Sequence, residues 1–346
     1  MVMERILFLT HTETDGSLSR GALETLAAAH QITQELSGAS LLVGLWGKQV
    51  DGAARAIASC GAAQFFGVTG DDFAVSRTAS DTVAMSALVR AAEASLVLTP
   101  TSSRTARALP IAAVRAGGRV DSHAVGFEVQ DGQLHLQRWY YRQRMQATLS
   151  RTHRPWFILV DSGLRQPWHG VEGNTSVKNV SVELPPTCRR THVEGTQAAQ
   201  SGTQTIRPEA KLLFVAGAGW TKKQSDGQTH AKEAERLILD LLTETGASLG
   251  GSKSMVEQSG QGQDVLSFMS HLNQIGKTGS TPRHPKGLAT CCHGEEPHVV
   301  GWRFIQERRA INTDAGCGWA QGKADVLYLA DAFAVMTKVN ELLRKT

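Results

Sequence analysis

The strongest constraint on the fold is the regular alternation of strand-length apolar runs with Ala-rich helical segments in the N-terminal half. The apolar runs are RILFLT (5–10), SLLVGLW (40–46), QFFGVT (64–69) and SLVLTP (95–100). Helical patterns lie between them, and another over residues 103–116 supplies a crossover after the fourth run. Parallel strands need such long connections. The sequence therefore predicts a mostly parallel sheet covered by helices, a three-layer α/β domain.

The pattern changes after residue 122, where strand-like segments follow one another without room for helices. These segments are HAVGFEVQ, LHLQRWYY, MQATLS and PWFILVD. Asp131-Gly132 is a turn signal between the first two. We expect all four to be antiparallel edge strands that complete a first domain over residues 1–184. Residues 185–210 are rich in Thr, Gln, Gly and Ser, and they are expected to form a linker.

A second series of strands and helices is predicted over residues 211–346. LLFVAGAG begins it as a buried strand, and the next helix has Ala234, Leu237, Ile238, Leu241 and Leu242 on one face before Gly246 ends it. Further short apolar runs and a closing helix to Leu343 favour an open, doubly wound parallel sheet. Ligands of such sheets bind beyond the carboxyl ends of the strands.

Residues 274–302, QIGKTGSTPRHPKGLATCCHGEEPHVVGW, are the strongest candidate for a ligand-holding loop system. The segment combines glycines and prolines with clustered Cys, His and Glu side chains, and it has no apolar periodicity. A run of this length cannot bury a continuous face. We therefore expect it to serve binding rather than packing.

Composition excludes several classes of protein. The chain has 346 residues, 41% of them hydrophobic and 20% charged, which suits a globular protein with two cores. Its 36 basic and 32 acidic residues form no long run of one sign, so nucleic acid is not an expected partner. No apolar stretch approaches the roughly 20 residues that cross a bilayer, so membrane insertion is not expected. Five cysteines and no apolar N-terminal leader favour the cytoplasm.

Local motifs in the second half leave more than one interpretation open. Gly217-Ala218-Gly219 follows a strand, as a phosphate-binding turn does, but the third glycine of that fingerprint is missing and a tight turn fits the spacing equally well. Gly276-Lys277-Thr278 does not complete a P-loop, because His271 stands five positions earlier, where the first glycine is needed. Asn312 and Asp314 present an amide and a carboxylate after a strand, although this pattern is also common in simple turns.

Metal and nucleophile sites are not expected. Soft ligands are present at Cys291, Cys292, His293 and His298, with Cys317 further along. Adjacent cysteines point in divergent directions and the paired CxxC spacing is absent, so packing is the favoured role for these thiols. Gly250-Gly251-Ser252-Lys253-Ser254 lacks the spacing of a nucleophile elbow, and no catalytic residue is predicted.

Several motifs occur in an order that resembles one protein family. They are the segment TPTSSRTARALPIAAVRAGGRVDSHAVGFEV, GAGW at Gly217, GGSKS at Gly250, QIGKTG at Gln274, CCHGEEPH at Cys291, INTD at Ile311, and the late acidic residues Asp325 and Asp331. In this order they are similar, over nearly the whole chain, to the α subunit of the electron transfer flavoproteins.

The resemblance implies an electron carrier rather than an enzyme. It implies an α/β heterodimer in which the C-terminal domain of this chain holds most of an FAD. An electron transfer flavoprotein β subunit would cover the flavin. Electrons would arrive from a dehydrogenase and leave to a membrane quinone reductase or a similar acceptor.

The resemblance also implies a set of cofactor-binding residues. Thr278 would lie near flavin N5, and Asn312 and Asp325 on the adenosine and ribose side. His298 would lie near flavin O2, where a cationic imidazole stabilises the negative charge of the reduced ring. The full set is Gly217, Gly219, Ser252, Lys253, Gln274, Ile275, Gly276, Lys277, Thr278, His293, Gly294, His298, Asn312 and Asp325.

The departures from the family pattern predict altered tuning of the flavin. Ala218 and Lys253 stand where the family has arginine, and Glu295 and Glu296 add carboxylates beside the expected cofactor. We expect a specialised carrier that serves one dehydrogenase, for example one that oxidises a methylated amine. The competing hypothesis is a flavin-free structural or regulatory subunit that only holds its β partner.

Overall fold

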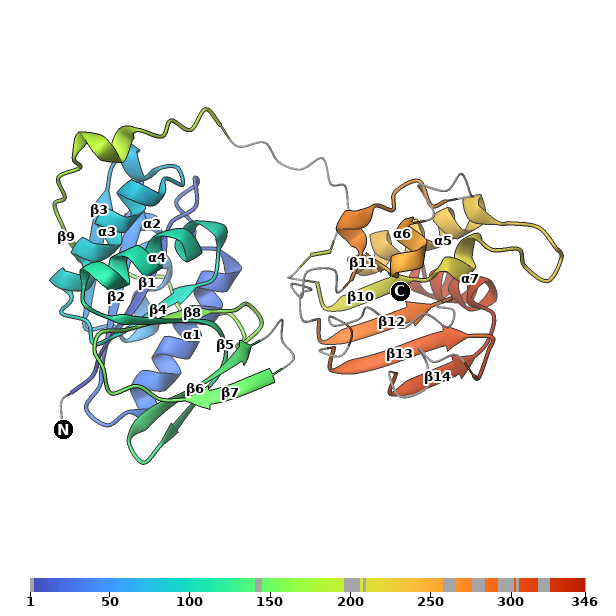
Figure 1. Ribbon diagram of the computed structural model, residues 1–346, viewed down its shortest axis with the longest axis horizontal. Coiled ribbons are helices and arrows are strands. Elements are labelled where there is room, and N and C mark those ends of the chain that lie inside the picture. The colour runs from blue at the N-terminus through green and yellow to red at the C-terminus, as the bar shows by residue number, and fades with distance from the viewer. Residues whose placement is uncertain are drawn as a thin grey trace. The chain divides into compact units, whose positions relative to one another are not determined.

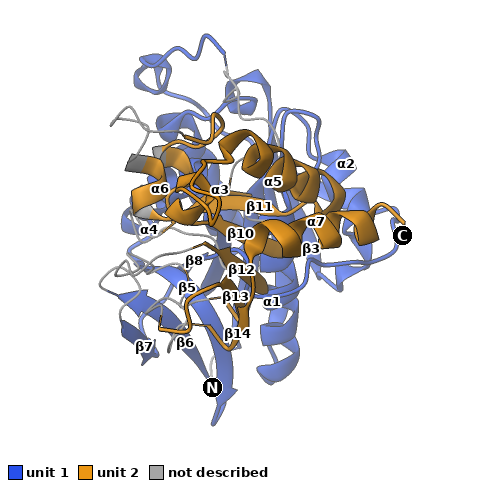
Figure 2. Ribbon diagram, turned by 90° about the vertical axis from the view of Figure 1, so that its right-hand side faces the viewer, with its two compact units in different colours: residues 1–141, 145–196 blue, residues 142–144, 197–346 orange. Residues whose placement is uncertain are grey.

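The protein is an α/β fold with two separate sheets. A computed structural model describes residues 3–140, 145–195, 206–207, 210–257, 265–275, 284–291, 302, 305–316 and 324–345, without the side chains of Lys253, Glu257 and His271. The chain divides into two compact units, residues 1–141 with 145–196 and residues 142–144 with 197–346 (Figure 2). Among the described residues, no helix is both long enough and apolar enough to cross a bilayer.

The described strands of unit 1 form one nine-stranded sheet in the order β7-β6-β5-β8-β4-β1-β2-β3-β9 (Figure 1). Only the β5–β6 and β6–β7 pairs are antiparallel. The strands are β1 (Arg5–His11), β2 (Ser40–Gly47), β3 (Gln64–Thr69), β4 (Leu96–Pro100), β5 (Arg119–Gln130), β6 (Gln133–Tyr140), β7 (Met145–Leu149), β8 (Trp156–Val160) and β9 (Val177–Asn179).

Helices cover both faces of this sheet, as the strand and helix alternation predicted. The principal helices are α1 (Arg20–Glu35), α2 (Asp51–Ala56), α3 (Thr78–Ala91) and α4 (Ser103–Arg115). Residues of α1 and α2 share one core with Ile6 and Phe8 of β1, whereas α3 and α4 share the other with Leu7 and Leu9. Alternate residues of β1 thus face opposite cores, which makes unit 1 a three-layer fold.

The expectation that PWFILVD forms an antiparallel edge strand was wrong. Its strand, β8, lies inside the sheet and pairs in parallel with both β4 and β5. All five residues of WFILV are buried. A strand covered on both faces has an unbroken apolar run, whereas an edge strand with one solvated face alternates. The antiparallel edge consists of β6, which pairs with β5, and β7, which pairs with β6.

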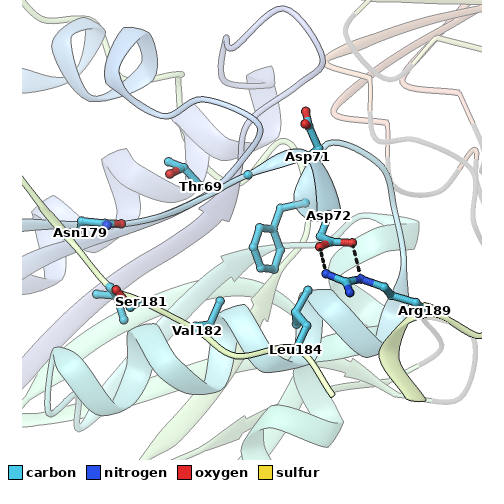
Figure 3. A pocket seen from close by; sticks show the side chains of 11 residues that line it. Thr69, Asp71, Asp72, Asn179, Ser181, Val182, Leu184 and Arg189 are labelled. Atoms are coloured by element: carbon cyan, nitrogen blue, oxygen red, sulfur yellow. Dashed lines mark hydrogen bonds and ion pairs between the residues drawn. The ribbon is translucent and has the colours of Figure 1, made fainter. Parts of the chain in front are cut away.

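The residues that follow β9 pack against unit 1 as far as Arg189. The short 3-10 helix η3 (Pro186–Arg189) contains Cys188, which is buried. Arg189 donates two hydrogen bonds to Asp72 of η2 (Asp71–Phe73), at 3.2 and 2.7 Å (Figure 3). These bonds lower the pKa of the Asp72 carboxyl. The first part of the segment expected to be a linker is therefore anchored through an ion pair.

Unit 2 has a parallel sheet in the strand order β11-β10-β12-β13-β14 among its described residues (Figure 1). Its strands are β10 (Leu212–Ala216), β11 (Ser248–Gly251), β12 (Lys286–Thr290), β13 (Glu307–Asn312) and β14 (Val326–Leu329). Its helices include α5 (Ala231–Thr245), α6 (Lys253–Glu257) and α7 (Ala332–Leu343), with the 3-10 helices η4 (Ala218–Thr221) and η6 (His271–Asn273).

The two faces of this sheet pack against different groups. Helices α5 and α7 cover one face, and Leu213, Val215, Ile275 and Trp302 share the core on the other. The five predicted apolar residues of α5 are buried, and Gly246 ends the helix in the left-handed conformation at φ 63°. Numbered from β10, the strand order is 2-1-3-4-5, the flavodoxin-like form of the doubly wound sheet.

Candidate functional site

The strand order places a topological switch point between β10 and β12. From β10 the chain crosses to β11 on one side, and it later returns to β12 on the other side. Ligands of open parallel sheets bind outside the carboxyl ends of the strands at this point. The candidate site is therefore the carboxyl edge of the unit 2 sheet, formed by the residues that follow each strand.

Gly217 and Gly219 lie at the switch point, but their amides are already hydrogen-bonded. The Gly217 N–H donates to the Thr290 carbonyl at 2.8 Å, and the Gly219 N–H donates to the Cys291 carbonyl at 2.9 Å. The segment between them begins the 3-10 helix η4, and Ala218 is 1% exposed. Of the two interpretations of this motif, these contacts favour the tight turn, because both amides donate to carbonyls of the protein.

Trp220, which the sequence analysis did not select, packs beneath the residues of this edge, in the core of unit 2. Its side chain is fully buried, and Nε1 donates to Thr290 Oγ1 at 2.8 Å. The Thr290 hydroxyl in turn donates to the Val215 carbonyl at 3.0 Å. The Trp220 ring also packs against Phe333 of α7, with a centroid distance of 4.6 Å. Trp220 thereby ties the ends of β10 and β12 to the start of α7.

Ser252, Gln274 and Ile275 come together after β11. The Ser252 N–H donates to the Ala216 carbonyl at 3.0 Å, and Ser252 Oγ accepts from the Met255 N–H at 3.3 Å, which caps α6. Gln274 forms a parallel bridge with Gly251. The Ile275 N–H donates to the Gly251 carbonyl at 3.2 Å, and its side chain is buried in the core. Two polar side chains, Ser252 and Gln274, therefore flank the end of β11.

The ends of β13 and β14 add an amide and a carboxylate to the same edge. Asn312 is 5% exposed, and its Oδ1 accepts from the Asp314 N–H at 3.0 Å in an Asx turn. Asp331, beyond β14, accepts from the N–H groups of Phe333 and Ala334 at 3.2 and 3.4 Å and so caps α7. The signal for Asp331 was present in the sequence, because an aspartate directly before an apolar helix is a capping pattern.

Cys291 follows β12 in a left-handed conformation, with φ 55°. Burial, together with the negative charge of Asp331, raises the pKa of its thiol from 9.0 to about 12. The thiol is therefore protonated at neutral pH and is a poor nucleophile or metal ligand. In the described part of the chain, no three His, Cys, Asp or Glu side chains form a group that could hold a metal ion.

The structure does not bring Asp325 to the other predicted site residues. Asp325 precedes β14, and its carboxylate accepts from the Arg308 N–H at 2.7 Å and pairs with the Arg308 guanidinium at 2.7 Å. Both residues lie at the amino ends of their strands. The run from Arg308 to Asn312 spans about 13 Å of strand. Asp325 thus belongs to the opposite edge of the sheet, in an ion pair.

The remaining predicted residues lie outside the described part of the structure. They are Gly276, Lys277, Thr278, His293, Gly294 and His298, together with the side chain of Lys253. The described residues therefore form the base of the candidate site, with Ser252, Gln274 and Asn312 as its polar side chains.

One protein-family model, described as the electron transfer flavoprotein domain, matches residues 6–187, more than half of the 346 residues. The chain belongs to the electron transfer flavoprotein family. Members of this family are electron carriers rather than catalysts in general, and they typically bind flavin. A search of the curated proteins found no match.

The electron transfer flavoprotein match covers unit 1 from β1 to η3. Unit 2, which contains the candidate site, lies beyond it. Membership in the family therefore indicates electron transfer together with other electron transfer proteins.

Proposed function

We propose that this chain is the α subunit of a heterodimeric electron transfer flavoprotein and holds FAD at the carboxyl edge of the unit 2 sheet. The observation that carries the proposal is the convergence of Ser252, Gln274 and Asn312 at that edge. These side chains come from segments far apart in the sequence, and the flavodoxin-like strand order gathers them where such sheets bind ligands. When bound, FAD supplies reversible electron transfer.

The chemistry of the edge fits a flavin nucleotide held by side chains rather than by a glycine-rich turn. Ser252 and Gln274 offer a hydroxyl and an amide beside β11, and Lys253 begins the adjoining helix. Asn312 offers a second amide beside β13. We expect Thr278 and His298 to complete the flavin end, with His298 as a cation near the ring carbonyl.

Charge at the edge restricts where a diphosphate can lie. Asp331 occupies the first amides of α7 and adds a negative charge, so that helix terminus does not accept a phosphate. The amides of Gly217 and Gly219 are also engaged. The diphosphate is therefore expected near Ser252 and the basic residues Lys253 and Lys277, on the β11 side of the switch point.

The proposed partners follow from the family resemblance. A β subunit would cover the flavin, a dehydrogenase would donate electrons, and a quinone reductase or a similar acceptor would receive them in the cytoplasm. The altered residues Ala218, Lys253 and Lys277 favour a carrier dedicated to one donor, for example a dehydrogenase of a methylated amine. Equal electron transfer from an acyl-CoA dehydrogenase and an amine dehydrogenase would contradict that specialisation.

A flavin-free subunit is the second candidate, and one observation favours it. The amides of Gly217 and Gly219 and the first turn of α7 are all hydrogen-bonded within the protein. An edge with those amides occupied would also suit a subunit that only holds its partner. The two candidates differ in whether the edge binds FAD at all.

The test is a titration of the heterodimer with FAD, followed by flavin fluorescence, in variants of the two sheet edges. Ser252→Ala and Asn312→Ala change the carboxyl edge, and Asp325→Asn changes the amino edge. We expect each carboxyl-edge variant to weaken FAD binding about tenfold, the effect of losing one hydrogen bond to a charged or strongly polar group, whereas Asp325→Asn leaves it unchanged. Loss of affinity in Asp325→Asn alone would place the adenosine at the other edge and contradict the assignment.

A further inference from the structure

A groove between α3 and α4 of unit 1 has the composition of an anion site. It encloses a cavity of about 450 Å³, within the range of small-molecule pockets. Its lining includes Arg77, Arg107 and Arg115, with hydroxyl groups from Ser76, Thr78 and Thr191. None of the lining residues that the structure describes is acidic. We call this feature the α3–α4 groove.

The arginines of the groove are arranged rather than scattered. Arg107 is held by two hydrogen bonds, from Nε to the Ser103 carbonyl at 2.7 Å and from Nη2 to Ser76 Oγ at 2.8 Å. Arg77 is largely buried and pairs with Asp72 at 3.2 Å. Arg115, in the last turn of α4, has no ion-pair partner among the residues that the structure describes. Within the described ranges, two of the three cations thus form no ion pair with a carboxylate, which favours an anion between them.

Neighbouring acidic groups lie outside the groove, although Glu93 lines an adjoining pocket together with Arg115. The Asp81 carboxylate is fully buried, where it accepts from Arg104 at 2.6 Å and from Trp46 Nε1 at 2.9 Å, and it does not line the groove. Asp72 pairs with Arg189 as well as with Arg77. The start of α3 has no side-chain cap, but Asp81 in its first turn accepts from the Arg77 N–H at 3.2 Å, so the charge of the groove comes from its arginines rather than from the helix end.

The spacing of the arginines indicates an extended ligand. Arg107 and Arg115 are eight positions apart on α4, a separation of about 12 Å along the helix axis. A single phosphate can contact both guanidinium groups only if both side chains bend toward it. A ligand with two linked phosphate groups can contact one arginine at each end and still fit the cavity.

We propose that the α3–α4 groove binds a small diphosphate-bearing anion. The site lies within unit 1 and does not depend on whether the unit 2 edge holds FAD. Arg107 and Arg115 bind the two phosphate groups, and the hydroxyl groups of Ser76 and Thr78 complete one end.

Isothermal titration of the full-length protein at low ionic strength tests this site, with inorganic pyrophosphate and orthophosphate as the probes. We expect one pyrophosphate per chain, bound more tightly than orthophosphate. Arg107→Gln and Arg115→Gln should each weaken pyrophosphate binding about tenfold. The matched control is Arg55→Gln, which removes an exposed charge from α2 outside the groove and should change the affinity less than about twofold.

Three outcomes would overturn the proposal. One is the absence of saturable pyrophosphate binding to the unaltered protein. Another is equal weakening by all three substitutions, which would mean general attraction to a basic surface. The third is binding that Arg107→Gln and Arg115→Gln leave unchanged, which would place the pyrophosphate elsewhere, for example at the unit 2 edge. Circular dichroism of each variant confirms that these helix-surface changes leave the fold intact.

Discussion

At the end of β12, Cys291 combines a left-handed backbone conformation with a thiol whose pKa is raised. A residue other than glycine in the left-handed region carries a steric cost, and such positions persist only where the surrounding structure holds them. Here the Cys291 carbonyl accepts from Gly219, and its N–H donates to the Ile311 carbonyl at 3.3 Å. The residue links three strand ends at the switch point, which accounts for its conformation without a catalytic role.

The raised thiol pKa leads to a prediction about reactivity and alkaline stability. Between pH 9.0 and about 12 the folded protein keeps the Cys291 proton while the unfolded chain loses it, so the free energy of unfolding falls as the pH rises through this window and the contribution is intact below it. Iodoacetamide at pH 8 should leave Cys291 unmodified in the native protein and modify it after unfolding, as peptide mass spectrometry can show. Cys291→Ala should reduce the slope of stability against pH above 9.

Rapid native modification at pH 8 would contradict this assignment. It would mean that the thiol is exposed and ionised, and the thiol chemistry excluded above would become relevant again. In Asp331→Asn the Cys291 pKa should be raised less than in the unaltered protein, because the substitution removes the negative charge of Asp331 and leaves the burial of the thiol in place.

The Asp81 carboxylate gives a second prediction about a single residue. It is fully buried and accepts from Arg104, Trp46 Nε1 and the Arg77 N–H. Asp81→Asn leaves the Arg104 cation buried without its counter-charge, so we expect a loss of about 3–5 kcal/mol in the free energy of unfolding. Urea denaturation measures it, with Asp51→Asn on the exposed surface as the control. A loss below 1 kcal/mol would show that Arg104 finds solvent or another partner.

At the scale of elements, the placement of β8 between β4 and β5 depends on a close approach at Gly118. A Cβ at this position would lie 2.5 Å from the Pro155 carbonyl oxygen and 2.6 Å from Phe157 Cε2. Glycine therefore allows β5 to begin directly against the start of β8. β8 can then pair in parallel with β5 on one side and with β4 on the other.

Gly118→Ala should consequently destabilise unit 1 by about 1–3 kcal/mol, the usual cost of overpacking. Gly52→Ala is the matched control: Gly52 lies in α2, and a Cβ there would approach only the Gly16 carbonyl oxygen, at 3.9 Å. That change should be neutral or stabilising by up to about 1 kcal/mol. Thermal unfolding of both variants measures the difference, and equal stability would show that β5 can shift away from β8 at little cost.

Elements with a strong local signal could be predicted from the sequence, and those decided by tertiary contacts could not. The apolar stripe of α5 and its glycine stop identified that helix correctly. WFILV was placed at the edge because it followed three strands without helices, although its unbroken apolar run already favoured a buried strand. At the site, Asn312 could be identified as a strand-end residue, whereas Ser252 came only from the family resemblance, because no strand was predicted before it. Trp220 was not, because no local pattern distinguishes a supporting tryptophan from any other buried one.

Asp325 shows how strand direction can correct a motif. The predicted strand Val326–Leu329 already placed Asp325 before it, at the edge opposite the expected ligand. The resemblance alone assigned Asp325 to the cofactor. The parallel register of β13 and β14 places Asp325 at the edge opposite Asn312, since Arg309 pairs with Val326 and Asn312 with Leu329.

For the whole molecule, the division into two units has a clear physical basis. In the described residues, each sheet draws all its strands from one unit, and each unit has its own apolar cores on both faces of its sheet. A fragment of residues 1–196 should therefore fold alone, with cooperative thermal unfolding and the far-ultraviolet circular dichroism of an α/β protein. A fragment that aggregates or lacks a cooperative transition would show that unit 1 depends on unit 2.

The central claim is that this member of the electron transfer flavoprotein family holds FAD at the carboxyl edge of its unit 2 sheet. The most direct measurement is the visible absorption spectrum of the full-length protein purified with its β partner, followed by identification of the cofactor released on denaturation. We expect flavin absorption bands and about one FAD per heterodimer. A folded heterodimer without flavin absorption, which also fails to take up added FAD, would contradict it and leave the flavin-free subunit as the function.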